Sequence, residues 1–374
     1  MGHSGEVPDG QSHPHGRDSG PISVAGAAGS RSWQRGPHQG YIVPVPRADK
    51  LSKYRSKRSR ERTPEPVPPD GSLPEGNDDT FVIQEHHARR LHWDFRLERD
   101  GVLVSWAIPR GVPLDPQTNH LAVHTEDHPI EYATFAGEIP RGEYGGGRVE
   151  IWDRGTYSTE KWTDREVKLV LAGGRVSGRY VLFQTDGDNW MIHRMDPRVE
   201  GWEPLPDLLE PMRPVQRARL PQHQERYGFE FDWGGERILA YISGGSARFR
   251  GARGEDVTAD HAQLRSLGPA LGSRQVLLDG EMTTLAGRST YAIYDILHSD
   301  GRSTIDQAYE KRRTLLHELD LNGPHWQVAP WFRGDGAAVR AAAREERLAG
   351  IVAKRLDAPY EPGKESASWL RIPV

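Results

Sequence analysis

Short runs of alternating hydrophobic and polar residues, separated by Gly and Pro, fill the chain between about residues 81 and 195. Alternation with a period of two is typical of β-strands that bury one face. The runs lie at residues 81–87, 91–98, 102–109, 120–126, 147–155, 166–173, 178–184 and 189–195. Many short strands with few helical windows predict a β-barrel or a β-sandwich for this region.

The pattern changes after residue 227. Strand-like runs at 228–233, 237–242, 246–251, 275–282 and 289–297 are now mixed with helical periodicity at 305–319 and 336–350. This mixture predicts a second, α+β domain over residues 227–374. Residues 198–226 are interrupted by prolines and are interpreted as a linker. The cations of the two helical windows alternate with Glu, which favours ordinary solvated faces; they are Lys311, Arg312, Arg313, Arg340, Arg344 and Arg347.

The N-terminal part of the chain contains two segments of different composition. Residues 1–48 are rich in Gly, Ser, Pro and His without periodicity, which predicts a disordered tail. The first domain, residues 49–197, then begins with a basic arm made of Lys50, Lys53, Arg55, Lys57, Arg58, Arg60 and Arg62. Such an arm would follow a phosphate backbone and make binding dependent on salt. A solvated basic linker is the alternative.

Composition narrows the classes of function. The 374 residues suggest two domains, and the absence of cysteine excludes disulfides and thiolate metal sites. No apolar run of about 18 residues and no secretory signal are present, which predicts a cytoplasmic protein without membrane contact. A net charge of −4 gives no global attraction to nucleic acid, so any such attraction must come from local clusters.

Candidate chemistry lies on the polar face of the run at residues 91–97. The hydrophobic positions Leu91, Trp93, Phe95 and Leu97 leave His92, Asp94 and Arg96 together on the other face. Imidazole and carboxylate ligands suit Mn²⁺, Fe²⁺, Co²⁺ or Zn²⁺, and a guanidinium fits a phosphate. Alternating polar residues are also common on solvated strand faces. A second cluster in LAVHTEDHPIEY, with His124, Glu126, Asp127 and His128, favours the metal and phosphoryl interpretation.

The segments FVIQEHHARRLHWDFRLERDG, SWAIPRG, HTEDHPIEYATFAGEIPRGEYGGGRVEIWDRGTY and WMIHRMD closely resemble the 3′-phosphoesterase domain of bacterial end-joining DNA ligase D, over about residues 51–197. The resemblance implies a small β-barrel that uses Mn²⁺ to trim DNA 3′ ends. It would remove a terminal ribonucleoside and then the remaining 3′-phosphate, leaving a 3′-OH. The metal ligands that it implies are His86, His92 and Asp94.

The resemblance also implies roles for residues around the metal. Arg96 and His128 would hold the scissile phosphate, with Gln84 assisting and Tyr132 behind them, whereas His87 would be a surface residue. A protonated His128 would donate a proton to the leaving group. Within the arm, Arg58 and Glu65 match the family.

Three positions depart from the family pattern. Ser59 stands where the family has an aspartate, and His120 and Arg110 stand where it has a basic residue and a lysine. These departures leave the phosphate-removing core intact and put the ribonucleoside-removing step in question.

The segments YGFEFDWGGERILAYI, LLDGEM, YAIYDIL, GIVAKRLDAPY and SWLRIPV resemble the adenylation domain of ATP-dependent DNA ligases, over about residues 208–374. In that family a lysine attacks ATP, but here Asp232 holds its position, and a carboxylate forms no phosphoramidate. Ala349 replaces an acidic residue, Arg371 and Pro373 replace a lysine pair, and the chain ends where an OB-fold domain would follow. We therefore expect a pseudo-adenylation domain that uses no ATP.

Glu281, Asp295, Arg237 and Lys354 of the ligase pattern remain. They are interpreted as structural ion pairs or DNA-facing residues, with residual nucleotide binding as the alternative. The leading hypothesis is a Mn²⁺-dependent 3′-end-healing phosphoesterase of end-joining DNA repair, nucleoid-associated and working with a separate ligase or an end-binding repair protein. The competing hypotheses are a non-enzymatic scaffold that binds DNA ends and recruits a ligase, and an active ligase.

Overall fold

The computed structural model describes residues 33–35, 42–44, 49–71, 73–285 and 287–374. The chain forms two units, Met1–Asp49 and Lys50–Val374. In the first unit, strands β1 (Trp33–Arg35) and β2 (Ile42–Pro44) pair antiparallel. The disorder predicted for residues 1–48 otherwise falls outside the described residues and stays a prediction.

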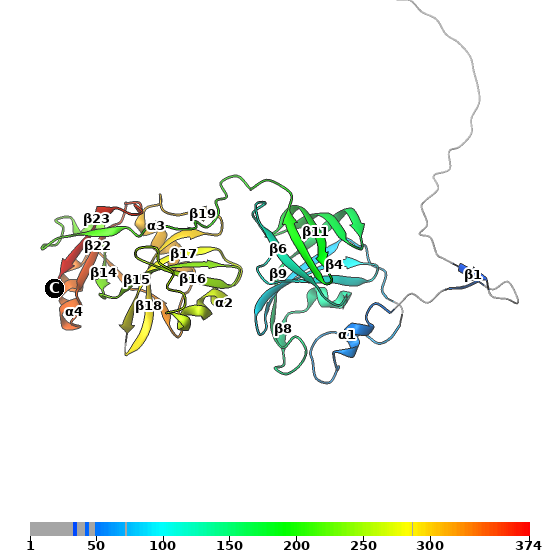
Figure 1. Cartoon of the computed structure of the whole chain (residues 1–374). Coiled ribbons are helices and arrows are strands. Elements are labelled where there is room, and N and C mark those ends of the chain that lie inside the picture. Colours follow the sequence, from blue (N-terminus) through cyan, green and yellow to red (C-terminus); the bar gives the residue numbers. More distant parts are fainter. Residues whose placement is uncertain (1–32, 36–41, 45–48, 72, 286) are drawn as a thin grey trace, which may run out of the picture. The chain divides into compact units, whose positions relative to one another are not determined.

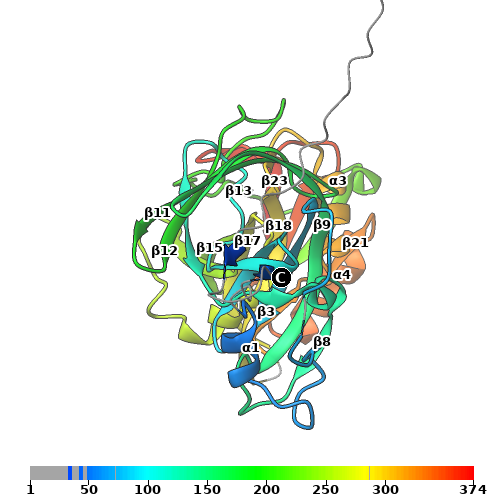
Figure 2. The same cartoon turned by 90° about the vertical axis from the view of Figure 1, so that its right-hand side faces the viewer.

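Eight antiparallel strands close into a barrel (Figures 1 and 2). Around the barrel they follow the order β3-β4-β5-β6-β12-β11-β10-β9, and β9 pairs again with β3. Their bounds are β3 (Thr80–His87), β4 (Leu91–Arg99), β5 (Val102–Ile108), β6 (Asn119–His124), β9 (Gly147–Thr163), β10 (Glu166–Gly173), β11 (Ser177–Asp186) and β12 (Asn189–Arg194). The predicted β-barrel is therefore confirmed over the sandwich, because β9 pairs with both β3 and β10 and leaves the ring without an edge.

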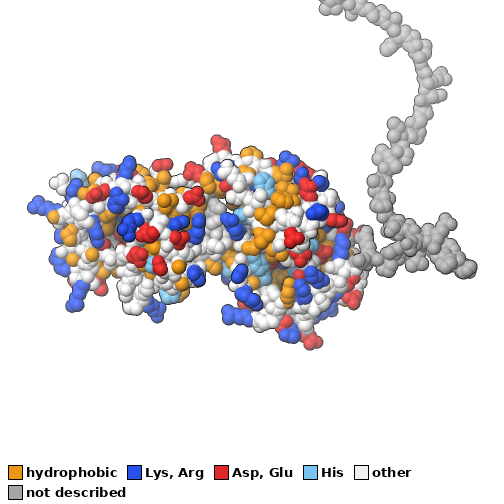
Figure 3. Space-filling view, in the orientation of Figure 1, with side chains coloured by type: hydrophobic (Ala, Val, Ile, Leu, Met, Phe, Trp, Pro, Cys, Tyr) orange, Lys and Arg blue, Asp and Glu red, His pale blue; other side chains and the backbone are white. Residues whose placement is uncertain are grey.

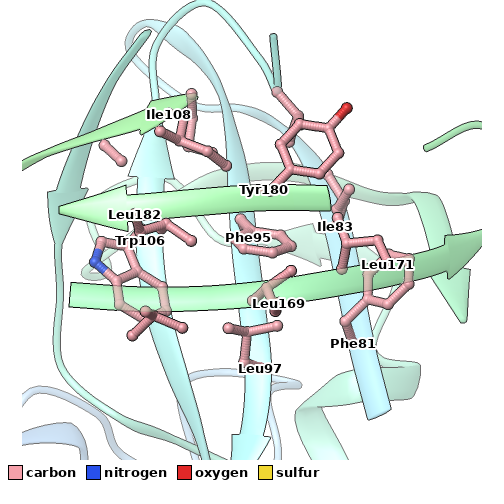
Figure 4. Close-up of a cluster of buried hydrophobic side chains, with 14 of the residues drawn as sticks. Phe81, Ile83, Phe95, Leu97, Trp106, Ile108, Leu169, Leu171, Tyr180 and Leu182 are labelled. Atoms are coloured by element: carbon pink, nitrogen blue, oxygen red, sulfur yellow. The ribbon is translucent and has the colours of Figure 1, made fainter. Parts of the chain in front are cut away.

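Alternation along each strand separates the barrel interior from its outer face. Phe81, Ile83, Phe95 and Leu97 point into the interior, where they pack with Trp106 (Figure 4). The residues between them, including Asp94 and Arg96, therefore lie on the outer face.

The outer face of β3 and β4 is not solvated, because other elements cover it. These are the arm helix α1 (Ser52–Ser56), strand β7 (His128–Pro129), the 3₁₀ helix η1 (Ile130–Thr134) and strand β8 (Gly137–Ile139). Leu51 and Tyr54 of the arm pack with Val102, Leu103 and Tyr132 in a second, small core. The arm is thus part of the folded domain and not a solvated linker.

The second domain contains two sheets with helices packed on them. One sheet has the order β13-β23-β22-β14-β21, and the other β16-β15-β17-β18-β19, with β20 beside β18. The strands are β13 (Arg213–Gln216), β14 (Tyr227–Asp232), β15 (Glu236–Ser243), β16 (Ser246–Gly251), β17 (Val276–Leu285), β18 (Arg288–Ser299), β19 (Arg302–Ser303), β20 (Trp326–Val328), β21 (Trp331–Arg333), β22 (Gly350–Arg355) and β23 (Glu365–Pro373).

The helices of this domain are η2 (Gln224–Arg226), η3 (Ala262–Ser266), α2 (Leu267–Leu271), α3 (Tyr309–Glu318) and α4 (Gly336–Glu345). Helix α3 packs on β18, and α4 packs on β14 and β22. The predicted α+β class and both predicted helical windows are confirmed. None of the helices in the described residues is long and apolar enough to span a membrane.

Two expectations for this domain are wrong. The segment predicted as a linker, residues 198–226, contributes β13, which pairs in parallel with β23. Pro214 is compatible with a strand there because β13 lies at the edge of its sheet. Arg312 and Arg313 of α3 are buried and not solvated. Arg312 pairs with Asp295 at 2.8 Å, and Arg313 donates to the backbone carbonyls of Tyr294 and Ala329.

On the face shown in Figure 3, Lys and Arg side chains are interspersed with Asp and Glu side chains over both domains. This mixture agrees with the small net charge of −4. Attraction of DNA through that face would therefore depend on local groups of cations.

Candidate metal and phosphate site

Strands β3 and β4 place the predicted metal ligands opposite one another. Their antiparallel register pairs His86 with His92 and Gln84 with Asp94. Cross-strand partners lie on the same face, so these four side chains share the outer face of the barrel. Nitrogen and oxygen atoms of His86, His92 and Asp94 all lie within 4.8 Å of one another. The structure therefore brings together the three residues for which the sequence predicts metal binding.

Backbone carbonyls orient the two imidazoles. His86 Nε2 lies 2.8 Å from the Gly145 carbonyl oxygen, and His92 Nδ1 lies 3.0 Å from the Arg90 carbonyl oxygen. A carbonyl only accepts, so these nitrogens carry the ring protons and leave the other nitrogen of each neutral ring with a lone pair. Those nitrogens, His86 Nδ1 and His92 Nε2, lie 3.4 and 3.6 Å from the Asp94 carboxylate. Two lone pairs and a carboxylate that face one another fit a divalent cation held by histidine and carboxylate.

Asp94 is ionised in this arrangement. Burial alone would raise its pKa, but the Arg96 guanidinium at 3.0 Å lowers the pKa of Asp94 well below its usual value. The carboxylate is therefore available as an anionic ligand at neutral pH.

Hydrogen bonds fix Arg96 beside the ligand cluster, which consists of His86, His92 and Asp94. Its Nε donates to Gln84 Oε1 at 2.8 Å, and its Nη1 donates to Ser105 Oγ at 2.9 Å. The Gln84 amide in turn donates to the carbonyls of Tyr132 and Phe135 at 3.1 and 2.9 Å. The Arg96 side chain is only 3% exposed. Gln84 thus holds the Arg96 guanidinium in place.

The basic arm delivers Arg58 to the same site. Arg58 pairs with Glu65 at 2.8 Å and with Glu126 at 3.2 Å, and its Nη2 lies 3.4 Å from His128 Nε2. Tyr132 donates its hydroxyl to Glu65 at 3.1 Å. The structure therefore brings Arg58, Glu65, His128 and Tyr132 together, and all four side chains are buried.

His128 is neutral in this environment. Its Nδ1–H donates to the Glu126 carbonyl at 2.8 Å, which leaves Nε2 as an acceptor facing Arg58. Burial, reinforced by the charges of Arg96 and Arg58, lowers the pKa of His128 well below its usual value. This argues against the expectation that a protonated His128 donates a proton to the leaving group.

Two buried residues that sequence reasoning did not assign complete the site. Glu126, whose side chain is 3% exposed, accepts from Arg58 and also from Lys57 at 3.0 Å. The position of Glu126 in the HTEDH cluster indicates a polar site, but the sequence alone does not indicate that it binds cations of the arm. Ser105 accepts from Arg96 and lies in SWAIPRG, where no pattern distinguishes it.

The three residues that depart from the family pattern lie in a turn, beside a backbone carbonyl and on the surface. The carbonyl of Ser59 accepts from Arg62 N and Thr63 N in a turn, and His120 hydrogen-bonds to the Gly111 carbonyl at 2.6 Å. Arg110 is exposed. His87 pairs with Glu85 at 2.8 Å and is not part of the ligand cluster.

The second domain has a cavity of about 390 Å³ at the position of the ligase pattern. It is lined by Glu230, Asp232, Arg237, Glu281, Lys354 and Arg371, among others. Each of its three cations is paired with a carboxylate: Arg371 with Asp232 at 3.1 Å, Lys354 with Glu230 at 2.6 Å and Arg237 with Asp279 at 2.6 Å. These pairs favour a structural role for Arg237 and Lys354. Glu281 accepts from the backbone N–H groups of Trp233 and Gly235.

Comparisons with known proteins identify both halves of the chain. Residues 84–184 match the DNA Ligase D 3′-phosphoesterase domain, and residues 283–372 match the ATP dependent DNA ligase domain. The "Multifunctional non-homologous end joining DNA repair protein LigD" of Mycobacterium tuberculosis is 44% identical over 347 residues, which cover 87% of this chain and 46% of that protein. The LigD protein of Pseudomonas aeruginosa is 29% identical over 406 residues, covering 88% of this chain and 47% of that protein.

The chain thus spans about half the length of these curated relatives. Among solved structures, the ligase domain of M. tuberculosis LigD is 32% identical with a TM-score of 0.41, covering 44% of this chain and 58% of that one.

Proposed function

Because the chain carries a DNA ligase D 3′-phosphoesterase domain followed by an ATP-dependent DNA ligase domain, we propose that it is a divalent-metal-dependent phosphoesterase. It removes 3′-phosphates from DNA ends during repair by end joining. The observation that carries this proposal is the convergence of His86, His92 and Asp94 beside Arg96 on one face of the barrel. A metal site next to a fixed guanidinium is suited to phosphoryl transfer.

Three cationic elements would meet at the scissile phosphate. A Mn²⁺ ion, or another divalent transition metal, held by His86, His92 and Asp94 would polarise a phosphoryl oxygen. Arg96 presents a guanidinium that Gln84 and Ser105 hold in place, so it needs no reorganisation when the phosphate arrives.

The arm would contribute a second guanidinium to the phosphate pocket. Arg58 is held by Glu65 and Glu126, and its Nη2 points toward His128. A phosphate dianion next to His128 would oppose the two arginine charges and raise the low pKa of that imidazole. His128 would then gain a proton only with substrate bound, and could hold the phosphate as the family resemblance implies.

For the second domain we propose a docking role without ATP use. Asp232 occupies the position of the nucleophilic lysine and is paired with Arg371. A carboxylate there repels a triphosphate and forms no bond to AMP. The partners that fit this proposal are DNA 3′ ends and a separate DNA ligase or end-binding repair protein.

The test is turnover of two labelled primer–templates, one with a 3′-phosphate and one with a 3′-ribonucleotide, in the presence of Mn²⁺, Mg²⁺, Zn²⁺ or EDTA. We expect metal-dependent conversion of the 3′-phosphate to 3′-OH. The ribonucleotide substrate shows whether the step put in question by Ser59 is retained. DNA binding without turnover under every condition would refute the phosphoesterase and support the scaffold hypothesis.

A further inference from the structure

A glycine-rich loop between β8 and β9 carries an exposed tyrosine next to the metal site. Turns close from Pro140 to Glu143 and from Glu143 to Gly146, and Gly145 adopts a positive φ of 77°. The Gly145 carbonyl is the group that orients His86. Tyr144, the preceding residue, is 49% exposed, whereas most aromatic side chains of residues 49–374 are buried or half-buried. The loop therefore places an aromatic side chain directly before the glycine whose carbonyl orients His86.

Cations of the basic arm hold this tyrosine. Lys57 donates to the Tyr144 hydroxyl at 2.9 Å, and its Nζ lies 4.1 Å from the ring centroid. The guanidinium of Arg58 lies 5.3 Å from the same centroid. Arg62 pairs with Glu143 at 2.5 Å, which gives the arm a second contact with the loop. These contacts fix the ring, whereas about half of its surface remains free to bind.

Lys57 and Arg58 also connect Tyr144 to the phosphate site. Both cations pair with Glu126, and Arg58 reaches His128. A phosphate bound by Arg96 and Arg58 would thus lie near a fixed aromatic ring with positive charge around it. This combination is typical of proteins that bind single-stranded nucleic acid, where bases stack on aromatic rings and cations follow the backbone.

We propose that Tyr144 is a substrate-positioning residue whose exposed ring stacks on the terminal base of the 3′ end. The inference rests on the proposed function and deepens it. Stacking would make the substrate a 3′-phosphorylated nucleotide at the end of a DNA strand, because a small phosphomonoester has no base to stack. Every base has a π-face, so the platform accepts any terminal base.

The test combines a change in the protein with a change in the substrate. Tyr144→Ala is assayed on a DNA with a 3′-phosphorylated terminal nucleotide and on the same DNA with an abasic terminal residue. We expect KM for the first substrate to rise about 5- to 100-fold with a much smaller change in kcat, as for loss of one base–aromatic stack. For the abasic substrate, KM should already be high with the original chain, and Tyr144→Ala should change it little. Equal effects on both substrates would overturn the proposal.

Two further variants separate stacking from loop structure. Tyr144→Phe keeps the ring and loses the hydrogen bond to Lys57, so it should recover most of the KM lost in Tyr144→Ala. Leu121→Ala removes a side chain of similar exposure, 40%, from β6 of the same domain and serves as the control. A Phe variant as impaired as the Ala variant would contradict stacking.

A second readout is independent of turnover. A 3′-phosphorylated oligonucleotide with a terminal 2-aminopurine is bound to protein in EDTA, and its fluorescence is measured at saturation. Stacking on Tyr144 should quench the fluorescence, and Tyr144→Ala should restore it. If no variant releases phosphate, the proposed function fails, and quenching alone decides the role of Tyr144. Equal fluorescence with both proteins would overturn that role.

Discussion

The barrel site and the cavity of the second domain use similar residues in opposite ways. In the barrel, the lone pairs of two imidazoles face the Asp94 carboxylate, an arrangement that a divalent cation would complete. In the cavity, the three cations are each paired with a carboxylate of the protein itself. Arg96 and Arg58 of the barrel are paired with carboxylates as well, so the difference between the two sites lies in the two imidazole lone pairs, which only a bound cation would satisfy.

This difference between the two sites depends on a few residues. Asp232, where the ligase pattern has lysine, supplies the carboxylate with which Arg371 pairs. In the barrel, by contrast, the backbone carbonyls of Gly145 and Arg90 take the ring protons and leave the ligand nitrogens free.

Removal of one metal ligand should have the largest effect. We expect His92→Ala or Asp94→Ala to lower turnover of a 3′-phosphorylated primer–template by about 10³-fold or more, because the metal supplies several kcal/mol of charge stabilisation. DNA binding, measured by fluorescence anisotropy, should change little, since it depends on cations of the arm. His87→Ala, outside the ligand cluster, is the matched control. Survival of turnover in either ligand variant would refute the site.

Breaking an ion pair of the second domain should cost stability. Lys354 and Glu230 are 2.6 Å apart, and both side chains are almost completely buried. Lys354→Met should therefore lower the free energy of unfolding by about 3 kcal/mol, because Glu230 loses a buried partner. The double variant Lys354→Met/Glu230→Gln should recover part of that loss. Urea unfolding measures the stability of both variants. If Lys354→Met were as stable as the original chain, the structural role of Lys354 would be contradicted.

Loss of the buried arm cation should reduce catalysis. Arg58→Ala is expected to lower kcat about 10- to 100-fold by removing a fixed cation from the phosphate pocket. Arg58→Lys should restore activity only in part, since an ammonium does not reproduce the contacts to Glu65, Glu126 and His128. Arg60→Ala, an exposed position of the same arm, is the control. Similar kcat values for Arg58→Ala and Arg60→Ala would show that the arm serves only in DNA binding.

The smallest effect concerns pH and Asp127. Burial raises the pKa of Asp127 to about 6 in the folded chain, against a usual value of 3.8. Between these values the folded chain binds the proton more tightly than the unfolded chain, so stability falls as pH rises from about 4 to 6. Asp127→Asn has no carboxyl to titrate, so its free energy of unfolding should fall about 1–2 kcal/mol less over this pH range than that of the original chain, allowing for partial exposure of the carboxyl. Unfolding midpoints at pH 4 and pH 7.5 test this, and parallel pH profiles for the two proteins would contradict it.

Much of the barrel and the candidate metal cluster on its outer face could be predicted from the sequence. The period of two placed His92, Asp94 and Arg96 on one face, and the family resemblance added His86. The cover over that face was not predictable, because packing of Leu51 and Tyr54 against Tyr132 joins residues far apart in the chain. For the same reason Ser105 and Glu126 had no assigned role, and Arg312 was expected in solvent although it pairs with Asp295. Local patterns report which face a residue occupies and not what covers that face.

One nicked duplex tests the contrast between the two domains most directly. The duplex carries a 3′-phosphate and a 5′-phosphate at the nick and is incubated with the full chain, Mn²⁺ and ATP. We predict that the 3′-phosphate is converted to 3′-OH and that the nick stays open. A sealed strand would contradict the account of the second domain, and an unchanged 3′-phosphate would contradict the account of the barrel site.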